Sequence, residues 1–179
     1  RAEQQQLGLI PGIPEHPGED RRDGEPARER RPPADAIRGT RLSSASRAVG
    51  VARACLEHSV RYANEREQFG QPIANFQMIQ EQIAEMYVEE HAARLLVYRA
   101  ACNRDLGQRN TIEVSCAKYY AAEVAVRAAN QAVKIFGSYG FSTEYPVERF
   151  YRDAKSYQIV EGTSNIQKMI IARNALGLK

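Results

Sequence analysis

The sequence contains no tryptophan, only three cysteines and three histidines in 179 residues, and no long apolar run. A membrane-spanning helix needs about 18 or more consecutive apolar residues, so no membrane span is expected. The N-terminal segment also lacks the apolar core of a secretory signal peptide. These absences predict a soluble protein of the cytoplasm or of an organelle matrix.

The few cysteines form no pattern that predicts a cross-link or a metal site. Cys55, Cys102 and Cys116 are odd in number and fall in segments with helical spacing, which favours buried free thiols over a disulfide framework. Cys55 and His58 have a spacing that suits a metal, but no second pair of ligands accompanies them. We therefore predict packing roles for these residues and no bound metal.

The charge balance points to no polyanionic partner. The chain has 25 basic and 22 acidic residues, which gives a net charge of +3. Its densest basic run, from Arg28 to Arg31, is interrupted by an acidic residue and has no interleaved aromatic side chains. Nucleic-acid binding is accordingly not expected.

The first 37 residues differ in composition from the rest. Six of the eight prolines lie between Pro11 and Pro33, among Arg, Glu, Asp and Gly and with almost no aliphatic residues. Such a segment cannot bury enough apolar surface to offset the entropy lost on ordering. We therefore predict a disordered or loosely attached tail over residues 1–37 and one folded domain over residues 38–179.

From residue 41 onward the sequence is rich in alanine, poor in glycine, and spaced like a series of helices. Glycine and proline mark the breaks, and Asn110 with Glu113 has the spacing of a capping box. Short connections between long helices favour antiparallel neighbours. The sequence predicts an all-α fold, an antiparallel four-helix bundle with an additional short helix. The predicted helices cover about 43–66, 75–106, 111–136, 147–154 and 164–177.

Helical spacing also predicts which side chains face the core. In the first helix the inward stripe is expected to include Val49, Ala52, Leu56, Val60 and Ala63. In the second helix it is expected to include Ile79, Ile83, Met86, Tyr87, Leu95 and Tyr98. In the last helix Ile166, Met169, Ile170 and Leu176 are expected to face inward.

One carboxylate stands at a turn before the last helix. Glu161, taken alone, is an acidic group that could help to cap that helix. Its surroundings, VEGTSNIQ at 160–167, occur together with REQFGQPI at 66–73 and FSTEYPVER at 141–149. With RDAK at 152–155, these segments resemble, in order and separation, characteristic segments of the acyl-CoA dehydrogenases, particularly the medium-chain type.

The resemblance covers about residues 38–178 and implies the C-terminal helical domain of such an enzyme. In the family this domain follows an N-terminal helical domain and a β-rich middle domain. The resemblance implies FAD-dependent α,β-dehydrogenation of an acyl-CoA thioester, with electrons passed to an electron-transfer flavoprotein. It also implies a homo-oligomer, a dimer or a tetramer.

By the same resemblance Glu161 is the base that removes the α-proton, and its backbone N–H helps to polarise the thioester carbonyl. Arg41 and Gly162 match positions near the substrate; a solvated arginine before a helix is the alternative for Arg41. Some family members carry the base at the position that Thr40 occupies here. Because threonine cannot serve as that base, the resemblance places the role on Glu161.

The resemblance also implies residues that contact FAD. Arg66 and Gly70 belong to an Arg-x-x-Phe-Gly element that meets the cofactor of a neighbouring subunit; a helix-terminal cation and a core phenylalanine are the alternatives for Arg66 and Phe69. Ser138 stands where the family often has a second glycine, and Val160 where an aromatic residue is common. The full set of implied FAD contacts is Arg66, Gln68, Phe69, Gly70, Lys134, Gly137, Ser138, Thr163 and Asn165.

Two other functions remain open on the sequence alone. The chain could be a non-catalytic helical oligomerisation module without flavin, since the N-terminal and middle domains are absent from it. It could also belong to an oxidase of the same family that returns electrons to oxygen.

Overall fold

The computed structural model describes residues 34–178, most of them helical. Most of the predicted tail, residues 1–33, lies outside the described residues. Between Ala34 and Leu178 no helix combines the length and apolar character that crossing a bilayer needs. The elements are α1 (Ala34–Glu65), β1 (Glu67–Gln68), β2 (Gln71–Pro72), η1 (Ile73–Asn75), α2 (Gln77–Asp105), α3 (Thr111–Phe136), η2 (Gly137–Phe141), α4 (Val147–Tyr157) and α5 (Ser164–Ala175).

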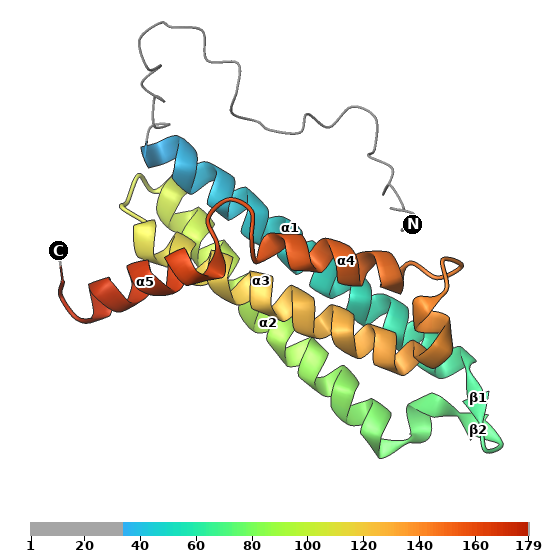
Figure 1. Cartoon of the computed structure of the whole chain (residues 1–179). Coiled ribbons are helices and arrows are strands. Elements are labelled where there is room, and N and C mark those ends of the chain that lie inside the picture. The colour runs from blue at the N-terminus through green and yellow to red at the C-terminus, as the bar shows by residue number, and fades with distance from the viewer. Residues whose placement is uncertain (1–33, 179) are drawn as a thin grey trace, which may run out of the picture. The chain divides into compact units, whose positions relative to one another are not determined.

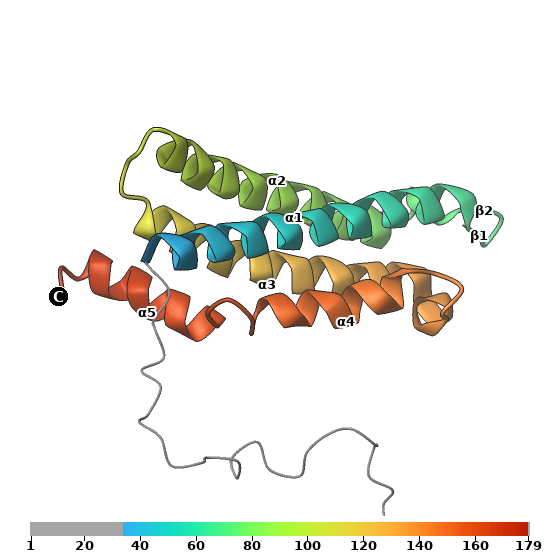
Figure 2. The same ribbon diagram turned by 90° about the horizontal axis from the view of Figure 1, so that it is seen from above.

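Helix α3 lies at the centre of the bundle and packs against each of the other four α-helices. Helices α1 and α3 run side by side, with α2 on one side of this pair and α4 on the other (Figures 1 and 2). Successive helices reverse direction up to α4, and α5 continues past the end of α4 along α3 (Figure 2). The prediction of an all-α antiparallel four-helix bundle with one additional short helix is confirmed.

The first helix begins earlier than its sequence spacing indicated. Helix α1 starts at Ala34, nine residues before the predicted start at Ser43, so Thr40 and Arg41 are helical residues. The Thr40 hydroxyl donates to the Ile37 carbonyl at 3.0 Å, one turn back. The other helix boundaries lie within about three residues of their predicted positions.

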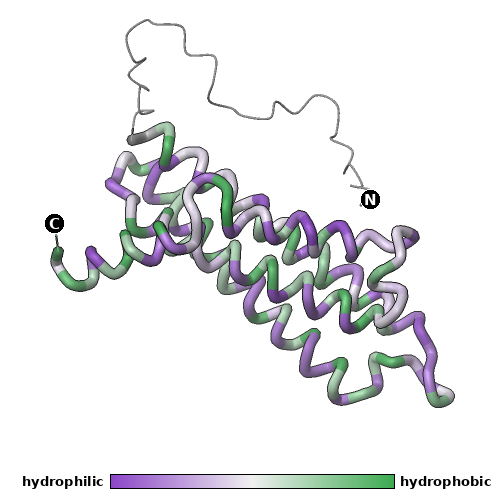
Figure 3. The backbone as a smooth tube through the Cα atoms, in the orientation of Figure 1, coloured by the Kyte–Doolittle hydropathy of each residue, from purple (hydrophilic) through white to green (hydrophobic). Residues whose placement is uncertain are grey.

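Small side chains let the helices of the bundle approach closely. Along α3 the buried residues are mostly alanines, spaced by three and four positions, so the backbone of this helix can lie near its neighbours. In Figure 3 hydrophobic and hydrophilic residues alternate along every helix, as expected where each helix has one buried face. The buried alanines of α3 are Ala117, Ala121, Ala122, Ala125, Ala128, Ala129 and Ala132.

An aromatic cluster closes the end of the bundle where α1 and α3 both finish. The ring of Tyr62 stacks on Phe136 at a centroid distance of 4.0 Å, and Tyr145 meets the Phe136 ring edge-on at 5.2 Å. The Tyr62 hydroxyl also donates to the Phe136 carbonyl at 3.5 Å. These contacts hold the end of α3 against α1, with Tyr145 from the segment after η2 packed on Phe136.

Several side chains predicted to face inward are exposed instead. On α2 the buried residues are Met86, Glu90, Ala93, Val97 and Ala100. Of the predicted stripe, Met86 is buried and Ile79 and Ile83 pack partly buried against the core. Two adjacent stripes of the later part of this helix have the same spacing, so periodicity could not decide which one is buried. The predicted core residues that are exposed are Val60 on α1, Tyr87, Leu95 and Tyr98 on α2 and, near the C-terminus, Ile166, Met169 and Leu176.

The capping box predicted at the start of α3 is not formed. Asn110 occupies the N-cap position, but its side chain makes no capping hydrogen bond. The side-chain amide of Asn110 donates instead to the Ala100 carbonyl at 3.1 Å, across the connection between α2 and α3. Asn110 therefore holds two helices together, a role that local spacing cannot predict.

The three free thiols differ in burial. Cys55 is buried and Cys116 half-buried, whereas Cys102, predicted to be buried, is exposed. Burial raises the pKa of the Cys55 thiol to about 12. Because the thiolate is the reactive form, we expect iodoacetamide to label Cys102 roughly tenfold or more faster than Cys55.

Peptide mass spectrometry of the labelled chain measures the two alkylation rates. The rates should converge in denaturant, where Cys55 loses its surroundings. Equal rates under native conditions would contradict the burial of Cys55.

Candidate active site

The carboxylate singled out by the sequence lies on a turn with an unusual backbone. Glu161 follows the end of α4 and precedes α5, with φ of 56°. Gly162 follows with φ of 92°. A left-handed backbone costs a non-glycine residue about 1–2 kcal/mol, so Glu161 is held in this shape by its surroundings.

The backbone N–H groups of this turn are partly unused. The N–H groups of Ile159 and Val160 both donate to the Ser156 carbonyl at 2.9 Å. Within residues 34–178, the N–H groups of Glu161 and Gly162 donate to no partner. The turn therefore presents an exposed carboxylate beside two free donors.

Gly162 lies against two polar side chains, and a larger residue would have to displace them and adopt a positive φ that L side chains disfavour. A Cβ atom at this position would come within 2.6 Å of Nε2 of Gln167 and 3.3 Å of Nε of Arg41. The Gln167 amide, which is fully buried, donates to the Gly162 carbonyl at 3.1 Å. Arg41 is half-buried, and its Nε makes no hydrogen bond within the described residues. Burial lowers the pKa of Arg41.

Helix α3 supplies a cation and an anion to the same turn. Lys118 is 1% exposed, and its ammonium donates to the carbonyl of Tyr157, the last residue of α4. Burial lowers the pKa of Lys118, Arg41 lowers it further, and the charges of Glu161 and Glu123 oppose this shift. Lys118, Arg41, Glu123 and Glu161 are thus close enough to interact electrostatically.

Thr163 and Asn165 lie just after Glu161. Thr163 is the N-cap of α5, and its hydroxyl accepts from the Ile166 N–H at 3.4 Å. Asn165 is exposed in the first turn of the helix. Both residues line a hollow of ≈ 390 Å³ together with Glu123, Lys155, Gln158, Ile159, Ser164 and Lys168.

A second group of predicted residues forms a short hairpin after α1. Strands β1 and β2 pair antiparallel, with Gln68 opposite Gln71. Phe69 and Gly70 form its turn with φ of 53° and 78°, the positive values that a type I′ turn requires. Phe69 is 93% exposed, which excludes the alternative that it is a core residue. No strand had been expected here.

The hairpin and the end of α3 share one cavity. It has a volume of ≈ 350 Å³ and brings together five predicted cofactor contacts, Arg66, Gln68, Phe69, Gly137 and Ser138. The guanidinium carbon of Arg66 lies 5.8 Å from the centre of the Tyr139 ring. Lys134 is exposed in the last turn of α3 and is not among the residues that line the cavity.

The two groups of residues lie at opposite ends of α1. Arg41 contacts the Glu161 turn, and Arg66 directly follows the helix, 25 positions later. At ~1.5 Å per residue, the backbones of Arg41 and Arg66 are roughly 35–40 Å apart. One small molecule bound to the Glu161 turn therefore cannot also reach the Arg66 cavity of the same chain.

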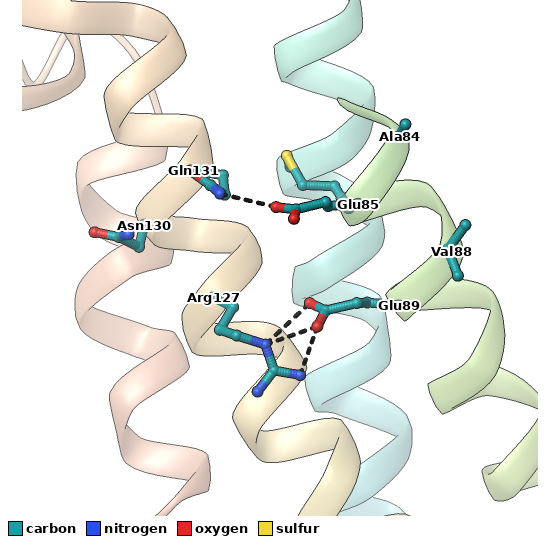
Figure 4. A pocket seen from close by; sticks show the side chains of 8 residues that line it. Ala84, Glu85, Val88, Glu89, Arg127, Asn130 and Gln131 are labelled. Carbon is teal, nitrogen blue, oxygen red and sulfur yellow. Dashed lines mark hydrogen bonds and ion pairs between the residues drawn. The ribbon is translucent and has the colours of Figure 1, made fainter. Parts of the chain in front are cut away.

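A third hollow, of ≈ 600 Å³, lies between α2 and α3 and contains none of the predicted site residues (Figure 4). Arg127 donates to Glu89 across it, with Nε 2.8 Å from Oε1. Gln131 donates to Glu85 at 3.4 Å. The polar side chains that face one another here join the two helices.

No metal site is evident in the described part of the chain, where no three His, Cys, Asp or Glu side chains are placed to hold an ion. Cys55 is buried in the core, and the ring of His58 packs against Phe150 at 5.6 Å. Both residues therefore have the packing surroundings that the sequence predicted.

Fold and turn together define the class of protein. It is an all-α bundle that presents a carboxylate on a left-handed turn, directly before a capped helix. The family model for the acyl-CoA dehydrogenase C-terminal domain matches residues 34–176. The chain belongs to the acyl-CoA dehydrogenase family and carries its C-terminal domain.

Individual relatives agree with this assignment. A glutaryl-CoA dehydrogenase of Desulfococcus multivorans is 55% identical over 141 residues, 78% of this chain and 36% of the relative. A subunit of a caffeyl-CoA reductase–Etf complex of Acetobacterium woodii is 47% identical over 132 residues, 74% of this chain and 35% of the relative. The solved butyryl-CoA dehydrogenase of Megasphaera elsdenii superposes with a TM-score of 0.78 at 44% identity, covering 79% of this chain and 37% of that one. The chain thus spans little more than a third of each relative's length.

Sequence reasoning missed the residues that support the turn, namely Lys118, Glu123, Gln158 and Gln167. One pattern could have indicated Lys118. The stripe Val114, Ala121, Ala125 and Ala128 on α3 has spacings of three and four only if position 118 belongs to it. A lysine in an otherwise apolar stripe is a buried charge, and a buried charge needs a partner.

Proposed function

We propose that the chain is the C-terminal part of an enzyme that dehydrogenates an acyl-CoA thioester between Cα and Cβ with FAD, and that Glu161 is the base. One observation carries the proposal. The Glu161 carboxylate and the free N–H groups of the same turn lie side by side, on a backbone that its surroundings hold in a strained form.

The chemistry needs both parts of this turn. An α-proton beside a thioester is too weakly acidic for an ordinary carboxylate, so the carbonyl must be polarised while the base acts. The Glu161 carboxylate takes the proton from Cα, and the Glu161 N–H donates to the thioester oxygen. FAD, when bound, accepts the β-hydrogen as a hydride, so the substrate loses two hydrogens in all. Gly162 keeps the turn free of a side chain, and Arg41 adds a positive charge beside it.

The residues of the second cavity fit the phosphates and adenosine of FAD. Arg66 offers a planar set of donors that suits a pyrophosphate. Gly137 and Ser138 are exposed at the cavity edge, where a ligand can come close to the protein backbone. The strained, exposed Phe69 favours a contact outside this chain.

The distance between the two ends favours a cofactor shared between subunits. The Arg66 cavity of one chain and the Glu161 turn of another would then serve one FAD. Lys134, Thr163 and Asn165 stay proposed cofactor contacts on the strength of the family resemblance. This arrangement requires a homo-oligomer, a dimer or a tetramer. The relative named as part of a complex with Etf supports an electron-transfer flavoprotein as the electron acceptor.

The alternative is a non-catalytic oligomerisation module. The exposed apolar side chains of α2, Val88, Leu95 and Tyr98, favour this function because they suit contact with another protein. Flavin chemistry separates the two functions, since a pure oligomerisation module needs no reduced flavin.

The test is a chimera in which residues 34–178 replace the matching third of the Desulfococcus relative. We expect a yellow oligomer whose flavin is reduced by an acyl-CoA and which passes the electrons to a dye. The isolated chain should retain little FAD through gel filtration, because the other domains are missing.

The parent relative is the positive control, and a second chimera carrying Arg66→Met should bind FAD more weakly. A folded, flavin-bound chimera that no acyl-CoA reduces, including the parent's own substrate, would leave the oligomerisation module as the better description. Peroxide formed by the active chimera would indicate an oxidase instead.

A further inference from the structure

A single carboxylate on α3 holds both ends of the Glu161 turn. Gln158, the residue after α4, donates its side-chain amide to Oε2 of Glu123 at 2.7 Å. Ser164, the first residue of α5, donates its hydroxyl to Oε1 of the same carboxylate at 2.8 Å. The two oxygens of one side chain thus set the distance between the residues that enter and leave the turn.

The backbone closes the same loop. The N–H of Ser164 donates to the carbonyl of Gln158 at 2.9 Å, so residues 158 and 164 are joined both directly and through Glu123. Lys155 donates to Oε1 of Gln158 at 2.6 Å and so fixes the orientation of that amide. The charge-assisted bonds to Glu123 are stronger than neutral ones.

Helix α3 also fixes the end of α4. The buried ammonium of Lys118 donates to the Tyr157 carbonyl, immediately before Gln158. Lys118 and Glu123 are five positions apart on α3 and bond to two consecutive residues, Tyr157 and Gln158. The central helix of the bundle therefore supports the left-handed turn at Glu161.

We infer that Glu123 is a positioning residue for Glu161, and that it acts by clamping Gln158 and Ser164 so that the turn between them keeps its left-handed backbone. The inference rests on the proposed function only in that Glu161 is taken as the base. A strained backbone persists only where its surroundings over-determine it. Glu161 itself is exposed and cannot supply that restraint.

The clamp explains why the turn can be both exposed and ordered. Without Glu123, the Ser164–Gln158 backbone bond, the Lys118 bond to the Tyr157 carbonyl and the bond from Gln167 to the Gly162 carbonyl would remain. None of these bonds involves Glu161, and the loss of both side-chain bonds to Glu123 would let its backbone relax to a negative φ. The carboxylate and its own N–H would then no longer keep the mutual arrangement that proton removal needs.

Hydrogen exchange on the 179-residue chain tests the clamp directly. Glu123→Ala should raise the exchange rate of the hydrogen-bonded amides in residues 158–164, those of Gln158, Ile159, Val160 and Ser164, by roughly tenfold or more, because two charge-assisted bonds are lost. Alanine suits a helix, so α3 itself should keep its stability. Glu123→Gln should restore most of the protection, since its amide can accept from Gln158 and donate to the Ser164 hydroxyl.

The matched control is Glu113→Ala, which removes a glutamate of the same helix whose ion-pair partner, Arg99, is 4.0 Å away. It should leave exchange in residues 158–164 unchanged. In the chimera described above, Glu123→Ala should lower kcat about tenfold, with a smaller change in KM, because it displaces the base rather than the binding groups. Glu123→Gln should recover most of that loss.

The outcomes separate this inference from the proposed function. Unchanged exchange in Glu123→Ala, in a chain with native circular dichroism, overturns the clamp whatever the chimera does. Faster exchange with unchanged kcat overturns Glu123 as a positioning residue. If the chimera without any substitution at Glu123 is inactive, the proposed function fails. The exchange experiment still decides whether Glu123 holds the turn.

Discussion

Glutamine in place of Glu161 is expected to lower kcat of the chimera by about 10³-fold, the range typical of a general acid or base. The amide has nearly the same shape as the carboxylate but cannot accept the α-proton. Its backbone N–H is unchanged, so the thioester oxygen keeps its donor. Binding of the acyl-CoA should therefore change much less than turnover.

Two measurements separate loss of the base from loss of the site. Stopped-flow reduction of the flavin gives the rate of the chemical step, and the absorbance of the purified protein gives the flavin content. Glu161→Gln should keep its flavin, because the amide has nearly the shape of the carboxylate and the residues of the Arg66 cavity are unchanged. Glu144→Gln, which alters another exposed glutamate of the chain, is the control and should turn over normally. Normal flavin reduction in Glu161→Gln would remove Glu161 from the mechanism.

The helices could be predicted because helix formation depends mainly on residues that are close together in the sequence. Apolar spacing, glycine and proline placed the helices to within a few residues, except at the start of α1. There the helix runs on to Ala34 through a segment that has no regular apolar stripe to indicate it. Helix α5 begins at Ser164, its predicted start, and Thr163 before it is the N-cap, a position that threonine favours.

What the sequence could not show depends on contacts between helices. Asn110 has the spacing of a local cap, yet its side chain bonds to the other helix at Ala100. On α2 two stripes have equal periodicity, and only packing against α1 and α3 selects the one with Glu90 and Ala93. The left-handed backbone of Glu161 is a third case, because glutamate has no local preference for it.

In the candidate site, too, the sequence indicated some residues, whereas others depend on contacts between helices. Glu161, Gly162 and the Arg66 hairpin were singled out through the family resemblance, which implies contacts with ligands for them. Lys118 and Glu123 touch only the turn, so they became visible once α3 was placed beside it. Both lie on α3, a helix that carries no predicted ligand contact apart from Lys134 at its far end.

Among the described residues, α2 carries a fully buried carboxylate that forms an ion pair. Glu90 is 0% exposed and accepts from Nε of Arg94, one turn later, at 2.9 Å. The terminal nitrogen of Arg94 contacts the same oxygen. The second oxygen of Glu90 accepts no hydrogen bond within residues 34–178; it lies 3.1 Å from Nδ1 of His91, which is closer to the Tyr87 carbonyl at 2.9 Å.

Arg94→Met is therefore expected to lower the free energy of unfolding by about 3 kcal/mol, because it leaves a buried carboxylate without its main partner. This is the lower end of the usual range, since the Arg94 side chain is 29% exposed. Urea unfolding of the chain, followed by circular dichroism, measures the change. The control is the double variant Glu90→Met with Arg94→Met, which removes both charges.

The double variant should be within about 1 kcal/mol of the original chain, or more stable, since apolar replacement of a whole buried pair is often neutral or stabilising. Together with the single variant Glu90→Met, these two variants complete a double-mutant cycle, which should give a large coupling free energy between Glu90 and Arg94. A loss below about 1 kcal/mol in Arg94→Met, the range of an exposed pair, would contradict the burial of Glu90. A double variant as unstable as Arg94→Met would assign the loss to packing of the arginine stem instead of to the unpaired charge.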